Sequence, residues 1–179
     1  ADGDAPSGFD GWFNGWKNQI ARSPFYATFN LLSSHDSPRM LTYLNGDTEK
    51  LKVAVLLQMT LPGMPSVYYG DEVSLAGGGD PDNRRVYPWS DTGGGQNGFS
   101  ADTDMYNFYK TIIGIRNDHS ALRRGEFTTI STSGSLYTFL RDDSNEKIVV
   151  IINNGASSST ANIDVSTHIA DGTVLTDLL

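Results

Sequence analysis

The chain has 179 residues, of which 38% are hydrophobic and 19% are charged, a composition typical of a globular protein and of one domain or slightly more. Its formal net charge of −8 argues against a nucleic-acid partner, because such binding needs a positive face. The absence of cysteine excludes a disulfide framework and thiolate metal ligands. No apolar run reaches the roughly eighteen residues of a membrane span, so no membrane partner is expected.

The first half of the sequence alternates helical and strand patterns. Apolar residues at helical spacing predict a helix over residues 9–22, and an apolar run predicts a buried strand over Phe25–Leu32. A second helix is expected over residues 48–60, with Asp47 as its N-cap residue, followed by a short strand over residues 66–69. Alternation of this kind predicts parallel strands joined by helices.

Ionisable residues follow both expected strands. His35, Asp36 and Arg39 come after the first strand, and the polar segment 70–72 comes after the second. Because ligands gather at the carboxyl ends of parallel strands, these residues are candidates for a functional site. The alternative is a simple capped loop, in which Asp36 or Ser37 starts a helix that has Pro38 in its first turn.

The connection over residues 70–102 is longer than the roughly 12–15 residues that structureless loops usually reach, which favours a functional loop. Its glycine triplets lack the following lysine and helix of a phosphate loop, so we reject nucleotide binding. Asp80 and Arg84 lie four residues apart. They form either a structural ion pair or a pair that binds sugar hydroxyls through bidentate hydrogen bonds.

A third helix is expected over residues 103–118, and after it the pattern changes to short strands separated by polar turns. These strands are expected over residues 125–130, 135–141, 147–153 and 162–165, with a last apolar strand over residues 173–179. They predict a small antiparallel β module that starts near residue 121. A terminal strand would leave an unpaired edge, and the chain has no initiator methionine, so we expect a truncated piece of a longer protein.

Three motifs in this order resemble those of the alpha-amylase family of glycoside hydrolases. Residues 30–39 resemble the motif after the seventh barrel strand, residues 63–72 that of the eighth strand, and residues 80–84 the substrate-binding loop. The likeness is greatest to the neopullulanase, cyclomaltodextrinase and maltogenic amylase branch. It implies an α/β part followed by an all-β part: the last βα units of a (β/α)8 TIM barrel over residues 1–120, then a truncated C-terminal antiparallel β-sandwich domain over residues 121–179.

The resemblance also implies roles for individual residues. Asp36 matches the aspartate that stabilises the transition state, and His35 matches the histidine that binds the same sugar. Asp80 and Arg84 match the pair that holds the next sugar, and Arg39 is a further candidate for substrate binding. No acid of the chain matches the nucleophilic aspartate or the acid/base glutamate of retaining catalysis. We therefore expect a fragment that is inactive alone.

The resemblance implies a fragment of a retaining alpha-glucan hydrolase that acts on alpha-1,4/1,6-linked glucans or cyclodextrins. The alternatives are a non-catalytic carbohydrate-binding module, with Tyr87 and Trp89 on its surface, and a purely structural fragment. Besides alpha-glucan oligosaccharides, the expected partner is the remainder of the parent enzyme or further copies of the chain. No metal or cofactor is expected here; relatives that bind calcium usually do so through segments upstream of this chain. Cytoplasmic and secreted locations both stay open.

Overall fold

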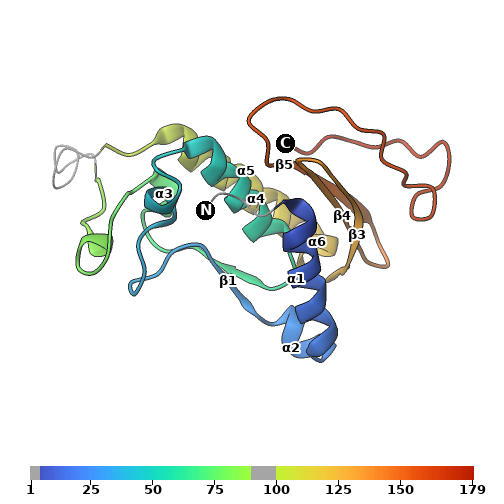
Figure 1. The fold of residues 1–179 in the computed structure, drawn as a ribbon, viewed down its shortest axis with the longest axis horizontal. Helices are drawn as coiled ribbons and strands as arrows, with labels where there is room; N and C mark the ends of the chain where they lie inside the picture. Colours follow the sequence, from blue (N-terminus) through green and yellow to red (C-terminus); the bar gives the residue numbers. More distant parts are fainter. Residues whose placement is uncertain (1–4, 90–99) are drawn as a thin grey trace. The chain divides into compact units, whose positions relative to one another are not determined.

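The computed structural model describes residues 5–89 and 100–179, which divide into two compact units (Figure 1). Unit 1 consists of Phe29–Met59 and Gly63–Gly114, and unit 2 of the residues up to Thr28, Thr60–Pro62 and Ile115–Leu179. The second glycine triplet of the long loop, at residues 93–95, lies outside the described residues. The N-terminal helices thus belong to the same unit as the C-terminal sheet. The domain boundary expected at residue 120 stays a prediction.

Unit 1 is built on two parallel strands joined by helices. Its elements are β1 (Phe29–Leu31), α3 (Met40–Tyr43), α4 (Thr48–Thr60), β2 (Met64–Ser66), the 3-10 helices η1 (Asp71–Val73) and η2 (Asp82–Arg84), and α5 (Thr103–Asp118), whose residues after Gly114 belong to unit 2. β1 pairs with β2 in parallel, with Phe29 opposite Met64. The strand–helix–strand alternation expected from the sequence is therefore confirmed.

The strand expected over Phe25–Leu32 is wrong in its first half. Residues Arg22–Tyr26 form helix α2, and β1 begins only at Phe29. Pro24 fits the first turn of α2, because an N–H group there has no partner within the helix. The predicted burial is also wrong, since the side chains of Phe29 and Leu31 are 67% and 56% exposed. Among the described residues, β1 has a single neighbouring strand.

The second parallel strand lies two residues earlier than expected, at Met64–Ser66 instead of residues 66–69. Pro65 has no N–H to donate to a ladder, which is tolerated where a strand has a neighbour on one side only. Met64 and Val67 are 46% and 37% exposed, whereas Leu75 is buried. The same lack of a further neighbouring strand among the described residues explains the exposed side chains.

The core of unit 1 lies between α4, α5 and the segment after β2. Both helices have the bounds expected from the sequence. The carboxylate of Asp47 accepts a hydrogen bond from the N–H of Lys50 at 3.0 Å, which confirms Asp47 as the N-cap of α4. The buried apolar side chains of this core are those of Leu51, Val55, Met59, Val73, Leu75, Met105, Tyr109 and Ile112.

Unit 2 contains α1 (Pro6–Gln19), α2, α6 (Ser120–Arg124), β3 (Glu126–Ser133), β4 (Leu136–Asp142) and β5 (Lys147–Asn153). The three strands form an antiparallel sheet in the order β3-β4-β5. α1 packs its aromatic side chains against this sheet, with the ring of Phe13 at 5.0 Å from that of Phe127 and 5.4 Å from that of Phe25. The aromatic residues of α1 therefore belong to the core of unit 2.

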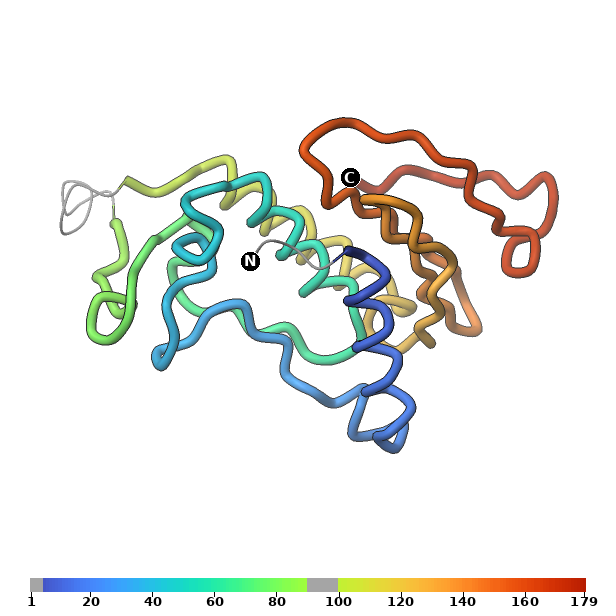
Figure 2. The backbone as a smooth tube through the Cα atoms, viewed as in Figure 1, coloured from blue at the N-terminus to red at the C-terminus, as the bar shows by residue number. Residues whose placement is uncertain are grey.

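The strands expected over residues 162–165 and 173–179 are not formed. The chain after β5 has no regular secondary structure, as the tube in Figure 2 shows. The N–H of Ser166 donates to the carboxylate of Asp164 at 2.9 Å, and such a local turn competes with strand pairing. No helix of the described ranges is long and apolar enough to cross a membrane.

Candidate functional site

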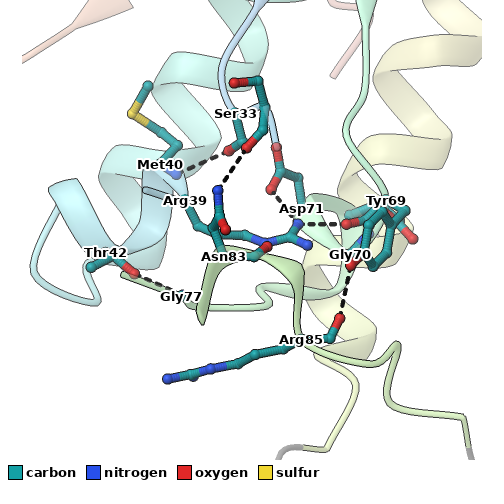
Figure 3. A network of polar contacts seen from close by, with 12 residues as sticks. Ser33, Arg39, Met40, Thr42, Tyr69, Gly70, Asp71, Gly77, Asn83 and Arg85 are labelled. Carbon is teal, nitrogen blue, oxygen red and sulfur yellow. Dashed lines mark hydrogen bonds and ion pairs between the residues drawn. The ribbon is translucent and has the colours of Figure 1, made fainter. Parts of the chain in front are cut away.

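Arg39 fastens together the three segments that carry the sequence motifs (Figure 3). Its side chain has no exposed surface. Nε donates to the carbonyl of Asn83 at 2.9 Å, and Nη1 donates to the carbonyl of Tyr69 and pairs with the Asp71 carboxylate at 3.1 Å. The guanidinium also lies 4.3 Å and 4.7 Å from the ring centroids of Tyr68 and Tyr69. One buried cation thus joins the exits of β1 and β2 to the loop at η2.

This enclosed position does not fit the direct sugar contact expected of Arg39 from the sequence. The guanidinium is enclosed by protein groups, so no part of it faces solvent. We therefore assign Arg39 a positioning role. The sequence indicated Arg39 as a candidate because a cation follows a predicted strand. A cation that binds backbone carbonyls of its own protein can occupy the same position, so the sequence does not separate the two roles.

Asn83 is a second buried polar residue of the site, and no motif or spacing in the sequence had pointed to it. Its Nδ2 donates to the carbonyl oxygens of His35 at 2.8 Å, Ser37 at 2.9 Å and Ser34 at 3.4 Å. The side chain is fully enclosed. The sequence did contain one signal for this role, namely an asparagine in the middle of a charged loop. The side-chain amide of asparagine has two N–H groups, which can donate to backbone carbonyls.

The loop at η2 comes unusually close to its own beginning at Gly77. A Cβ atom at Gly77 would lie 2.6 Å from the carbonyl oxygen of Asp82 and 2.9 Å from Cα of Asn83, so only glycine fits here. The carbonyl of Gly77 accepts from the N–H of Arg39 at 2.9 Å, and its N–H donates to the Thr42 hydroxyl at 2.9 Å. These contacts hold the loop against the start of α3.

His35 and Asp36 lie in the turn after β1 and face solvent. Their side chains are 65% and 76% exposed, and His35 Nε2 lies 3.2 Å from Asp36 Oδ2. The capped-loop alternative is wrong, because α3 begins only at Met40 and its first N–H is bound by the Ser33 hydroxyl at 3.0 Å. The Asp36 carboxylate therefore has no structural task at a helix start and is accessible to a ligand.

Asp80 and Arg84 form the ion pair expected from their spacing, with Arg84 Nη2 at 3.2 Å from Asp80 Oδ1. About half of each side chain is exposed, so the pair can accept a ligand. Arg84 Nε also donates to the carbonyl of His35 at 3.2 Å. The structure thus brings His35, Asp36, Asp80 and Arg84 together on neighbouring loops, and both the structural and the sugar-binding interpretations of the pair remain compatible with it.

Comparison with known proteins supplies the family. The profile described as the catalytic domain of alpha-amylase matches residues 8–125. The chain belongs to the alpha-amylase family. The resemblance inferred from the three motifs is therefore confirmed, and the two parallel strands fit a part of the TIM barrel of that family.

Alignments with relatives extend over most of this chain. An amylopullulanase of Thermoanaerobacter thermohydrosulfuricus is 37% identical over 87% of the chain, and a cyclomaltodextrinase of Bacillus sp is 42% identical over 79%. The solved structure of a debranching enzyme from Nostoc punctiforme, soaked with acarbose, has a TM-score of 0.79 and 33% identity over 90% of the chain. This chain spans 12%, 25% and 32% of those proteins, respectively.

In this member of the alpha-amylase family, Asp71 is the buried acid of the site. Burial raises the pKa of Asp71 to about 6, and the Ser33 hydroxyl and the Arg39 guanidinium lower it without offsetting that effect. The carboxyl group thus costs free energy when it ionises, even though a cation faces it. Its burial and its ion pair with Arg39 fit a structural role.

The raised pKa of Asp71 predicts a pH dependence of stability. Between its ordinary value of 3.8 and about 6, the folded protein holds a proton that the unfolded chain releases, so the contribution of Asp71 to stability falls as pH rises through this window. The expected loss is about 3 kcal/mol, complete somewhat above pH 6. We would measure the free energy of unfolding by urea at pH 4 to 7 for the parent chain and Asp71→Asn. The difference between the two curves should show this slope, and a flat difference would contradict the prediction.

Two further residues after β2 have structural partners. The Glu72 carboxylate accepts from the N–H of Gly70 at 2.8 Å, and the Tyr69 hydroxyl donates to the carbonyl of Arg85 at 2.9 Å. Glu72 therefore fits a structural role at the strand exit. Within the described part of the chain, no group of three or more His, Cys, Asp or Glu side chains could hold a metal ion.

Proposed function

We propose that this chain supplies the sugar-binding and transition-state-stabilising part of a retaining alpha-glucan hydrolase. The observation that carries the proposal is the placement of an exposed carboxylate, Asp36, beside the half-exposed pair Asp80 and Arg84. The two groups are linked through the backbone of His35, to which Arg84 donates. Membership of the alpha-amylase family supports this interpretation.

The chemistry of Asp36 follows from the transition state of glycoside hydrolysis. The sugar ring gains positive charge as the bond breaks, and its hydroxyl groups become more acidic. A carboxylate that accepts hydrogen bonds from these hydroxyls binds the transition state more tightly than the substrate, and interactions of this kind supply several kcal/mol. His35, at hydrogen-bond distance from Asp36, binds the same sugar. The nucleophile and the acid/base residue are placed in the remainder of a longer enzyme, since no acid of this chain matches their motifs.

The substrates that we propose are alpha-1,4/1,6-linked glucans or cyclodextrins. The relatives described above are named amylopullulanase, cyclomaltodextrinase and debranching enzyme, names that are consistent with this class. We further propose that the sheet β3-β4-β5 is part of the C-terminal β-sandwich domain of the longer enzyme. The observed antiparallel order of the three strands is compatible with such a domain.

The sugar-binding role of the Asp80–Arg84 pair is tested in the full-length enzyme that contains this chain. Asp80→Ala and Arg84→Ala should each raise KM for maltoheptaose about 10- to 100-fold, because charged hydrogen bonds to a ligand contribute about 1.5–3 kcal/mol. KM for a short aryl glucoside should change little. Lys50→Ala, which removes an exposed ion pair with Asp47, serves as the control. Equal KM values for the long substrate, or a large drop in melting temperature, would favour a purely structural pair.

A non-catalytic carbohydrate-binding module is the second candidate, favoured by Trp89, which is 59% exposed and packs its ring 4.4 Å from that of Tyr87. Calorimetry of the chain 1–179 with maltotriose, followed by analysis of the sugars, separates the candidates. Under our proposal, the chain alone releases no sugar. Hydrolysis at an ordinary enzymatic rate would contradict our proposal that the nucleophile and the acid/base residue lie outside this chain. Tight binding without hydrolysis would favour the carbohydrate-binding module.

A further inference from the structure

We propose that Asn83 is a positioning residue for Asp36, the residue that stabilises the transition state. The inference rests on the proposed function of Asp36 and adds to it the group that fixes its place. Asn83 itself is enclosed and does not reach the substrate. Its effect on the reaction would be exerted through the backbone of the turn that carries Asp36.

The hydrogen bonds of Asn83 reach both sides of Asp36. One amide nitrogen donates to the carbonyls of His35 and Ser37, the two residues that flank Asp36, at 2.8 Å and 2.9 Å, and approaches that of Ser34 at 3.4 Å. With the peptide group before Asp36 and the one after Ser37 both held, the Cα atom of Asp36 has little freedom to move. The side chain of Asp36 then projects from a fixed base.

The turn has few other restraints. Within it, the N–H of Asp36 donates to the Ser34 hydroxyl at 3.2 Å, and the hydroxyls of Ser34 and Ser37 lie 3.1 Å apart. These contacts move with the turn and do not anchor it. In the described part of the chain, the side chains that donate to residues 34–37 from elsewhere are those of Asn83 and Arg84. The buried amide is the stronger anchor, because Arg84 is half exposed and makes a single such bond at 3.2 Å.

Asn83 is itself held firmly, which a positioning residue requires. Its carbonyl accepts from the buried Nε of Arg39 at 2.9 Å, and Arg39 is in turn paired with Asp71. The backbone of Gly77 packs directly against its Cα atom. The chain of contacts from Asp71 through Arg39 and Asn83 to the turn at Asp36 consists of buried groups up to the turn itself. Figure 3 shows Asp71, Arg39 and Asn83 close to one another. Support of this kind keeps a catalytic group near its productive geometry.

The test is a double-mutant cycle in the full-length enzyme, with kcat and KM measured on an aryl maltoside. Asn83→Ala should lower kcat about 10- to 100-fold with KM within about threefold of the parent, because a misplacement of roughly 1 Å costs rate and not binding. In the Asp36→Asn background, the same substitution should lower kcat less than about threefold, since the group it positions is already lost. A merely structural role would lower kcat by the same factor in both backgrounds, which would overturn the inference.

Asn145→Ala is the matched control, because it makes the same change at an exposed residue of the turn between β4 and β5, outside the three motifs. Its kcat should stay near that of the parent. If Asn83→Ala fails to fold, Asn83→Ser keeps a small polar side chain and should show a weaker form of the same non-additivity. The two proposals fail separately: an unchanged kcat for Asp36→Asn refutes the proposed function, whereas a low kcat for Asp36→Asn with additive losses refutes only the positioning by Asn83.

Discussion

Replacing Asp36 by asparagine in the full-length enzyme should lower kcat by about 10²–10³ while leaving the fold intact, which is the usual effect of removing one group that stabilises a transition state. Asparagine has the same shape but lacks the negative charge that makes the carboxylate a strong acceptor for acidic hydroxyls. The side chain is 76% exposed, so the substitution disturbs no packing. Steady-state kinetics on a cyclodextrin and on maltoheptaose measure the effect.

The control for this experiment is Asp118→Asn, an exposed aspartate at the end of α5 that is far along the chain from the motifs. Both variants should melt within a few degrees of the parent. A further expectation concerns inhibition: acarbose, which was soaked into a related structure, should lose more affinity for Asp36→Asn than maltose does if Asp36 contacts the sugar that gains charge in the transition state. If Asp36→Asn has the kcat of the parent enzyme, Asp36 does not stabilise the transition state.

Asp71→Ala should destabilise the protein by about 3–5 kcal/mol, because it leaves the charge of Arg39 buried without a counterion. The side chains of this pair are 0% and 5% exposed, so solvent cannot replace the missing carboxylate. Urea unfolding at pH 7, followed by far-UV circular dichroism, measures the loss. The effect should exceed that of any exposed ion pair of the chain, since such pairs contribute at most about 1 kcal/mol.

Two companion variants sharpen this expectation. Asp71→Asn keeps an oxygen that can accept from Arg39 Nη1, so it should cost clearly less than Asp71→Ala. Glu49→Ala breaks an exposed pair with Lys52 and should unfold almost like the parent. If Asp71→Ala also unfolds like the parent, the Arg39–Asp71 contact does not hold the three motif segments together.

Local signals predicted much of the fold. The bounds of α4 and α5 were predicted correctly, because a capping aspartate begins the first and a Pro–Gly segment follows it. The three strands of the antiparallel sheet were also expected, from short apolar runs between polar turns. The first parallel strand was predicted to begin too early, because an apolar residue such as Phe25 is compatible with both a strand and a helix. Its burial against Phe13, a contact in unit 2, decides for α2, and no local pattern contains that information.

The site was predictable where its geometry is local and unpredictable where it is not. Asp80 and Arg84 lie four residues apart around Pro81, so the contact that is observed is local in the sequence. Arg39 and Asn83 interact mainly with backbone carbonyls, which every residue possesses and which therefore leave no trace in the sequence. Whether a polar residue is exposed for a ligand or enclosed by backbone depends on the fold. The sequence thus indicated which loops form the site, but not which of their residues support the others.

The contacts of Arg39 also bear on the order of events during folding. Its three hydrogen-bond partners lie 30, 32 and 44 residues further along the chain. We expect contacts of such separation to form late in folding, because the entropy of closing a long loop is lost before the contact contributes any stability. During synthesis, the full set of partners of the guanidinium is available only after the residues around Asn83 have left the ribosome. We therefore expect the turn after β1, the exit of β2 and the loop at η2 to become ordered together, since each of them contacts Arg39.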